Sequence, residues 1–309
     1  MSKNHYVILA GGVGAVKFIE GLVQVVVPKL LKIIVNTGDD IELFGLKICP
    51  DLDIITYTLA NLVDKSKGWG FVDETFNCLG ILKKYYNTGW FNAGDKDLAT
   101  HIYRTDLFNQ GFNKAEITKK ICKKLGVKPE IIPMCNEEVE TYIKTSETNM
   151  HFEEYFIKDK CEPQILDVEF KGIDKAKPVE GVLEYIEEAK KIIICPSNPI
   201  VSIGTILQVK GIRESLIKVK SKVYAISPII EGKAVKGPAD KLMRSLDLEV
   251  SSLGVAKYYK EFLGNFVIDN KDCRLKPKIE KLGIRTFCFD TLMINLEKKK
   301  ELAKFLIKK

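Results

Sequence analysis

The sequence runs Tyr6-Val7-Ile8-Leu9-Ala10-Gly11-Gly12-Val13-Gly14-Ala15-Val16-Lys17 near its start, and this stretch decides the fold. Its first part is a short apolar run rich in β-branched residues, which is typical of a strand buried on both faces. Glycines follow at once, and residues 17–23 then show a helical pattern. The stretch therefore predicts a strand that passes through a glycine loop directly into a helix.

The same alternation continues along the chain. Apolar runs bounded by Gly, Pro, Asn or Asp predict further strands at 32–35, 192–195, 222–226 and 266–269. Helical patterns predict helices at 52–63, 97–108, 182–189 and 238–246. Strands that alternate with helices favour a Rossmann-like, doubly wound α/β fold with a mainly parallel sheet. We expect a single domain over residues 1–309, with an aromatic-rich helical insertion or cap at 64–128.

Composition and charge exclude several classes of function. The 309 residues include 48 Lys and Arg against 41 Asp and Glu, a formal net charge of +7. The basic residues are spread out, whereas nucleic-acid recognition needs a clustered basic stripe. No apolar run approaches the length that spans a bilayer, and the start has no signal segment. We therefore expect a cytoplasmic protein with no nucleic-acid or membrane partner.

The cysteines argue against a zinc site. None of the eight stands in a CxxC pair, and the chain has only three histidines. Structural zinc sites are built from closely spaced Cys and His ligands. Because most of these cysteines stand among apolar residues, we expect reduced, buried thiols.

The glycine loop is a candidate phosphate site. Glycines let the backbone approach a phosphate, and free N–H groups at a helix start favour negative charge. Neither standard motif is present, because Val16 and Phe18 do not fit a Walker loop and Lys17 does not fit a dinucleotide fingerprint. We predict phosphate binding by Gly11, Gly12, Gly14 and Lys17; the alternative is a plain strand-to-helix turn.

Four carboxylates stand where strands end and helices begin. Asp39 and Asp40 follow the second predicted strand, and Asp51 and Asp53 open the next helix. Such positions face the ligand crevice of an open α/β sheet. Carboxylates together with phosphates suit Mg²⁺, and we expect Asp39, Asp40 and Asp51 to hold it. The alternative is that an aspartate only caps the helix.

Two later loops add polar groups. Gly94-Asp95-Lys96-Asp97 precedes a predicted helix, and its charges suit either a binding loop or a solvated helix start. Pro196-Ser197-Asn198-Pro199 follows another strand end, where prolines fix an extended loop and leave Ser197 and Asn198 free to bind. This loop suits a nucleobase, a ribose or a phosphate, or it is a structural turn.

Short motifs of this kind follow one another along nearly the whole chain. They are Gly11-Gly12-Val13-Gly14, Asn36-Thr37-Gly38-Asp39-Asp40, Pro50-Asp51-Leu52-Asp53, Gly68-Trp69-Gly70, Gly94-Asp95-Lys96-Asp97-Leu98-Ala99-Thr100-His101, Pro196-Ser197-Asn198-Pro199, Lys236-Gly237-Pro238-Ala239 and Asp290-Thr291-Leu292-Met293. In this order they resemble the 2-phospho-L-lactate transferase (CofD) family of coenzyme F-420 biosynthesis.

The resemblance implies a Mg²⁺-dependent transfer by a homodimer. A guanosine-diphosphate-activated three-carbon acid, lactyl or enolpyruvyl, would give its phospho-acyl group to the deazaflavin alcohol Fo, and GMP would leave. It also implies that Asp53, with Asp51 beside it, and Lys96 contact Fo. The glycine loop and Ser197-Asn198 would hold the nucleotide diphosphate. Lys96 stands where arginine is common in the family, so the planar fork of a guanidinium is lost there.

The chemistry of the implied reaction fits these residues. Phosphoryl-type transfer needs mainly positioning and charge neutralisation, and a carboxylate near the attacking hydroxyl can position it or accept its proton. We expect Asp53 or Asp51 in that catalytic role. Trp69 and Trp90 suit either a cover for the deazaflavin ring or packing in the core.

Two other classes remain open from the sequence. Proteins with a similar core act as nucleotide-sugar-binding regulators without an established transfer reaction, but their acidic loop is of a Pro-Gly-Asp type, unlike Pro50-Asp51-Leu52-Asp53. A nicotinamide-dependent oxidoreductase is disfavoured by Lys17 in the glycine loop.

Overall fold

The computed structural model describes residues 4–64, 68, 70–86 and 89–309. Its centre is a 7-stranded parallel sheet in the order β14-β13-β10-β9-β1-β2-β5, which confirms the predicted α/β fold. The strands of this sheet are β1 (Tyr6–Ala10), β2 (Leu31–Val35), β5 (Glu130–Pro133), β9 (Lys191–Ile194), β10 (Val223–Ile226), β13 (Asn265–Asp269) and β14 (Arg285–Phe289). All of the strands predicted from the sequence belong to it.

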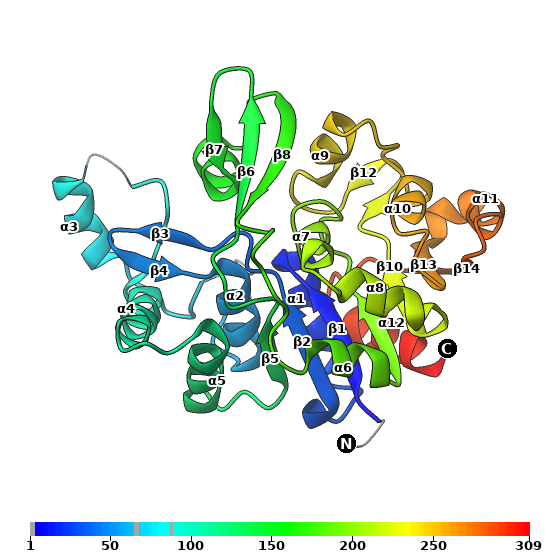
Figure 1. The fold of residues 1–309 in the computed structure, drawn as a ribbon, viewed down its shortest axis with the longest axis horizontal. Helices are drawn as coiled ribbons and strands as arrows, with labels where there is room; N and C mark the ends of the chain where they lie inside the picture. The colour runs from blue at the N-terminus through cyan, green and yellow to red at the C-terminus, as the bar shows by residue number, and fades with distance from the viewer. Residues whose placement is uncertain (1–3, 65–67, 69, 87–88) are drawn as a thin grey trace.

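Helices flank the sheet and fill the segments between its strands (Figure 1). The α-helices are α1 (Gly12–Leu22), α2 (Pro50–Leu59), α3 (Asn77–Tyr85), α4 (Asp95–Asn109), α5 (Lys114–Lys124), α6 (Val182–Glu188), α7 (Ile203–Gln208), α8 (Ile212–Lys218), α9 (Ala239–Ser245), α10 (Ser252–Tyr258), α11 (Lys276–Glu280) and α12 (Leu296–Lys308). Short turns of other helix types are η1 (Pro28–Leu30), η2 (Glu154–Lys158), η3 (Lys220–Lys222) and η4 (Asn270–Leu275). Within the described ranges, no helix combines the length and apolar character needed to cross a bilayer.

Alternate residues of β1 face opposite sides of the sheet, as the pleat of a strand requires. Val7 and Leu9 lie in one buried cluster, which α6, α7, α8 and α10 cover. Ile8 and Ala10 lie in the other, which α1, α2 and α12 cover. Both faces of the sheet are therefore buried under helices, and the unbroken apolar run of β1 follows from that.

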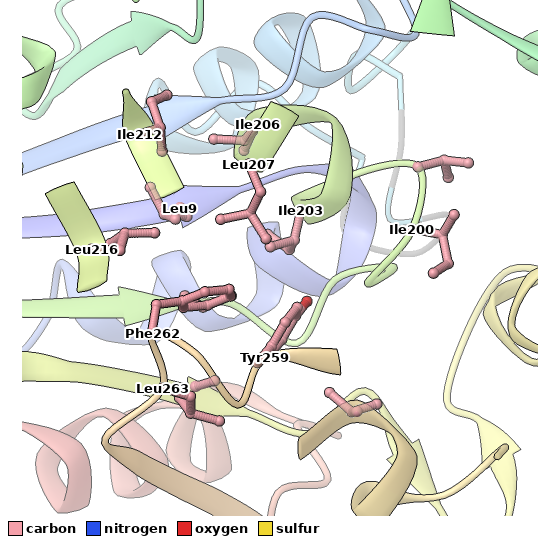
Figure 2. Packing of buried hydrophobic residues seen from close by; sticks show 14 of the residues in the cluster. Leu9, Ile200, Ile203, Ile206, Leu207, Ile212, Leu216, Tyr259, Phe262 and Leu263 are labelled. Carbon is pink, nitrogen blue, oxygen red and sulfur yellow. The ribbon is translucent and has the colours of Figure 1, made fainter. Parts of the chain in front are cut away.

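The first cluster is closely packed by side chains from distant parts of the chain. Figure 2 shows Leu9 of β1 near residues of α7 and near Tyr259 and Phe262, which follow α10. The side chains of Leu9, Tyr259 and Phe262 are almost completely buried. This packing fixes the position of α7, and so of the loop that precedes it.

Three smaller sheets were not predicted from the sequence. Antiparallel pairs form from β3 (Ile41–Leu43) with β4 (Leu46–Ile48) and from β11 (Ile229–Ile230) with β12 (Lys233–Ala234). A 3-stranded antiparallel sheet consists of β7 (Asn149–His151), β6 (Glu140–Thr145) and β8 (Ile165–Lys171). In Figure 1 the 3-stranded sheet of β6, β7 and β8 stands at the top of the view, away from the N-terminus.

The described part of 64–128 contains α3, α4 and α5, so the helical content expected there is present. That this segment acts as an insertion or cap within a single domain stays a prediction.

The expectation of reduced, buried thiols was wrong for three cysteines. Cys273 of η4 and Cys288 of β14 form a disulfide, with their Cα atoms 5.7 Å apart, and Cys78 is exposed. No motif predicted this pair, because the two residues meet only when η4 packs beside β14.

Candidate functional site

A cavity of about 520 Å³ lies at the carboxyl ends of the central strands. Its wall includes residues from the segments that follow five strands: Gly11 after β1, Asp39 after β2, Pro196 after β9, Ser227 after β10 and Thr291 after β14. Ligands of open α/β sheets bind at this edge, in the crevice beyond the strand ends. The cavity is therefore the candidate active site.

The glycine loop forms one wall of the cavity. Gly11, Gly12, Gly14 and Lys17 all line the cavity, and α1 begins at Gly12. Gly12 has a positive φ of 67°, which favours glycine. The first turn of α1 contains no acidic residue and its N-cap makes no side-chain hydrogen bond, so its positive end is not compensated there by a carboxylate of the helix itself.

Gly14 brings this loop against the loop after β9. A Cβ atom at position 14 would lie 2.2 Å from the carbonyl oxygen of Pro196, so only glycine fits without a backbone shift. We expect Gly14→Ala to lower the free energy of unfolding by about 1–3 kcal/mol, because it overpacks this contact. Gly80→Ala is the matched control, since it lies inside α3 with no atom within 4 Å of the added Cβ, and it should stabilise the protein slightly. Urea denaturation measures both; equal stabilities of the two variants would contradict the close contact.

Ser197 and Asn198 line the opposite side of this contact. The Asn198 side-chain oxygen accepts hydrogen bonds from the backbone N–H groups of Ile200 (3.0 Å) and Val201 (3.4 Å). The Ser197 hydroxyl is buried and has no hydrogen-bond partner among the described residues. Asn198 therefore stabilises the turn of this loop, and Ser197 leaves a buried hydroxyl without a partner among the described residues on the cavity wall.

A second lysine reaches the wall beside Lys17. Lys236, from the loop before α9, lines the cavity, and burial together with the charge of Lys17 lowers its pKa. Neither ammonium has an ion-pair partner in the described part of the chain. Two unpaired cations facing one cavity suit an anion.

Asn36 joins two of the predicted metal-binding carboxylates. Its amide nitrogen lies 3.0 Å from Oδ2 of Asp39 and 3.0 Å from Oδ2 of Asp51. The other Asp51 oxygen accepts a hydrogen bond of 2.6 Å from the N–H of Gly12. Asn36 thus holds the acid pair beside the glycine loop.

These acids carry more negative charge than the structure neutralises. Burial, with the charges of Asp51, Glu153 and Asp40, raises the pKa of Asp39 well above its usual range. Burial raises the pKa of Asp51 to about 6, against the hydrogen bonds from Asn36 and Gly12. Burial and the charges of Asp51 and Asp40 also raise the pKa of Glu153, which lines the same cavity, to about 8. A cation bound at this wall would relieve the repulsion.

The residues fit Mg²⁺ with two protein carboxylates. Oδ1 of Asp39 is buried without a hydrogen-bond partner among the described residues, so it is free to bind a cation. No group of three or more His, Cys, Asp or Glu in the described part of the chain is arranged to hold a metal ion. Mg²⁺ is commonly bound through one or two carboxylates together with substrate phosphate oxygens. Asp39 and Asp51 provide such a pair.

Asp40 does not lie on the cavity wall. Its carboxylate pairs with the buried ammonium of Lys114 at 2.6 Å. Burial raises its pKa against the opposing effect of Lys114. The side chain of Asp40 therefore lies apart from the pair Asp39 and Asp51, although Asp40 is next to Asp39 in the sequence.

Asp53 lines the cavity and is held by two residues of α4. Both of its oxygens accept hydrogen bonds from the guanidinium of Arg104, one of them at 3.0 Å. Nε2 of His101 lies 3.4 Å from Oδ2 of Asp53. Burial acts to raise the pKa of Asp53, but Arg104 and His101 outweigh it and hold the pKa below its usual range. Asp53 is therefore an ionised carboxylate in a fixed orientation.

Lys96 is bound by backbone carbonyls in this structure, and its expected contact with Fo stays a prediction. Its ammonium donates to the carbonyl oxygens of Val72 (2.6 Å) and Asp73 (2.8 Å), and it does not line the cavity. From the same loop, Asp97 does line the cavity, and burial raises its pKa to about 6. Trp69 lies outside the described residues. Trp90 is not among the lining residues, whereas its neighbours Phe91 and Asn92 are.

Several residues of the site had no role assigned from the sequence. They are Asn36, His101, Arg104, Glu153 and Lys236. Asn36, His101 and Lys236 stood within the quoted motifs, and Arg104 follows His101 by one helical turn, so a helix drawn from 97–108 could have placed both on one face. Glu153 had no such signal, because it precedes η2 in the segment after β7, and neither element was predicted.

The family model described as "2-phospho-L-lactate transferase CofD" matches residues 6–299. The 2-phospho-L-lactate transferase of Methanosarcina acetivorans is 40% identical over 301 residues, which cover 97% of each chain. The phosphoenolpyruvate transferase of Streptomyces griseus is 38% identical over 297 residues, covering 94% of this chain and 93% of that protein.

Solved structures support the fold. A crystal structure of a UPF0052 family member from Bacillus halodurans aligns with a TM-score of 0.64 and 16% sequence identity, over 99% of each chain. At that identity the similarity concerns the fold alone.

Proposed function

The chain belongs to the CofD family of 2-phospho-L-lactate transferases, and from this premise we propose that it transfers a phospholactyl or phosphoenolpyruvyl group to the deazaflavin alcohol Fo. The donor is a guanosine-diphosphate-activated lactate or enolpyruvate, and GMP is released. The product is coenzyme F-420 without its glutamate tail. The names of the relatives favour this transferase over the nucleotide-sugar-binding regulator and the oxidoreductase.

One observation carries the proposal. A single cavity joins three features that the reaction needs: the glycine loop with Lys17, the carboxylate pair Asp39 and Asp51, and the fixed carboxylate of Asp53. The donor brings a diphosphate, which suits the loop and its lysine. The acceptor brings a hydroxyl, which suits a hydrogen-bond acceptor such as Asp53.

The donor lies, in this proposal, along the glycine loop. Backbone N–H groups at the start of α1 and the ammonium of Lys17 bind the diphosphate oxygens. Ser197 and Asn198 bind the nucleotide side from the loop after β9. Gly14 keeps the two loops in contact, so that both hold the same ligand.

The acceptor lies against α2 and α4. Asp53 accepts a hydrogen bond from Fo and orients it, while Arg104 keeps that carboxylate ionised and in place. A Mg²⁺ ion held by Asp39 and Asp51 would neutralise charge on the donor's phosphate oxygens during the transfer. Because in-line phosphoryl transfer depends mostly on positioning and charge, these groups account for the main requirements.

The test is direct. Protein, Mg²⁺, Fo and each candidate donor are incubated together, and the products are followed by mass spectrometry. We expect an Fo adduct and equimolar GMP with at least one donor. Chelation of Mg²⁺ by EDTA should stop GMP release, and added Mg²⁺ should restore it. Calorimetry with UDP-sugars and NAD(P) covers the other classes; binding of either without any Fo adduct would overturn the proposal.

We also propose that the enzyme works in the cytoplasm as a homodimer. The dimer rests on the resemblance to the family, and light scattering at assay concentration tests it. A monomer at that concentration would contradict it.

A further inference from the structure

His101 is a buried residue of the cavity wall with no role so far beyond its contact with Asp53. It lies on α4, is 3% exposed and lines the cavity. We propose that His101 is the catalytic base that takes the proton from the attacking hydroxyl of the acceptor. This inference rests on the proposed transfer reaction.

The two ring nitrogens of His101 have different surroundings. Nε2 faces Oδ2 of Asp53 at 3.4 Å, and a nitrogen that faces a carboxylate carries the proton. Nδ1 is buried and has no hydrogen-bond partner among the described residues. The tautomer with its proton on Nε2 keeps a lone pair on Nδ1, on a residue that lines the cavity. A carboxylate that orients an imidazole whose other nitrogen is free is the arrangement of a general base.

The aspartates expected to act as the base are already engaged. Arg104 binds both oxygens of Asp53 and lowers its basicity. The two oxygens of Asp51 accept hydrogen bonds from Gly12 and Asn36. Each carboxylate can therefore orient a group or bind a cation, but Arg104 makes Asp53 a weak proton acceptor and the proposed cation occupies Asp51.

The other cavity carboxyls differ in position or protonation. Glu153 retains its proton near neutral pH, since its pKa is about 8. Asp97 lies one turn before His101 on α4 and is ionised at neutral pH, so it is the competing base. The test must therefore compare Asp97 with His101.

The proposed step balances. The acceptor's oxygen forms a bond to phosphorus while the bond from that phosphorus to the GMP oxygen breaks, and GMP leaves with the electron pair. The hydroxyl proton moves to Nδ1 of His101. The imidazolium so formed lies beside the carboxylate of Asp53, which stabilises it, and it returns the proton to solvent after the products leave.

His101→Gln tests the proposal, because glutamine keeps a side-chain N–H donor for Asp53 but does not accept a proton. We expect kcat to fall by about 10²–10⁴-fold, with the Kd of Fo, measured by calorimetry, changed by less than about threefold. His5→Gln is the matched control: His5 is buried, bonds the carbonyl of Tyr185 and does not line the cavity. It should keep the wild-type kcat.

Two further variants separate a base from a structural residue. Imidazole added to His101→Ala should restore part of the lost kcat, which a purely structural role would not allow. Asp97→Asn should reduce kcat less than His101→Gln does. The proposal is overturned if His101→Gln keeps kcat near the wild-type value, if its kcat and Fo affinity fall together, if imidazole restores nothing, or if Asp97→Asn shows the larger loss. Wild-type enzyme in the same assay distinguishes these outcomes from failure of the proposed function, since that failure would appear as no GMP release at all.

Discussion

Asp53→Asn will release GMP in the presence of Fo roughly 10³–10⁴-fold more slowly than the wild type, the loss that follows when an orienting carboxylate is amidated. Asparagine has nearly the same shape, but it lacks the charge that Fo and His101 contact in the proposed complex. Its amide also presents a donor where an acceptor is needed. Fo-dependent GMP release measures the effect, with circular dichroism to confirm that the fold is intact.

The control must account for Arg104. Amidation of Asp53 leaves the guanidinium of Arg104 buried without its partner, and that alone destabilises the protein. The double variant Asp53→Asn/Arg104→Met removes the unpaired charge, so it should recover stability but no activity. Asp106→Asn, on the exposed side of the same helix, should keep full activity. Full activity in Asp53→Asn would remove Asp53 from the mechanism.

Arg104→Met will lower the free energy of unfolding by about 3–5 kcal/mol, because it leaves the charge of Asp53 buried and unpaired. Arg104 is 3% exposed, and besides Asp53 it binds the carbonyl oxygen of Lys47 at 3.2 Å. It therefore connects α4 to α2 and to β4. Urea denaturation, followed by circular dichroism, measures the change.

An exposed ion pair is the comparison. Arg213 pairs with Glu261 at 3.0 Å near the surface, so Arg213→Met should cost less than about 1 kcal/mol. If Arg104→Met were no more costly than Arg213→Met, the buried pair would not have the structural role assigned to it.

The central sheet could be predicted from the sequence because its strands are buried on both faces. Ile192-Ile193-Ile194 and Tyr6-Val7-Ile8-Leu9 are continuous apolar runs, and burial on both faces leaves little room for polar residues. In β8, by contrast, only Ile165 is buried, and polar residues alternate irregularly along the strand. The 3-stranded sheet of β6, β7 and β8 was not predicted for that reason.

The site was predicted in part. Loops after strands and the starts of the helices that follow converge at one edge of a parallel sheet, so Gly11, Asp39 and Asp51 could be placed together from sequence position alone. Whether Asp40 and Lys96 line the cavity depends on the direction in which each side chain points. Lys114 binds the first, and backbone carbonyls bind the second. Such local competition is not encoded in a motif.

The cavity wall draws on segments from Gly11 to Met293. During synthesis the glycine loop is made first, but the wall is complete only when the residues near Thr291 have been added. A premature stop anywhere before that point would leave Lys17 and Asp51 facing solvent on an unfinished crevice. A complete cavity wall therefore requires almost the whole chain, and a shortened product would lack part of it.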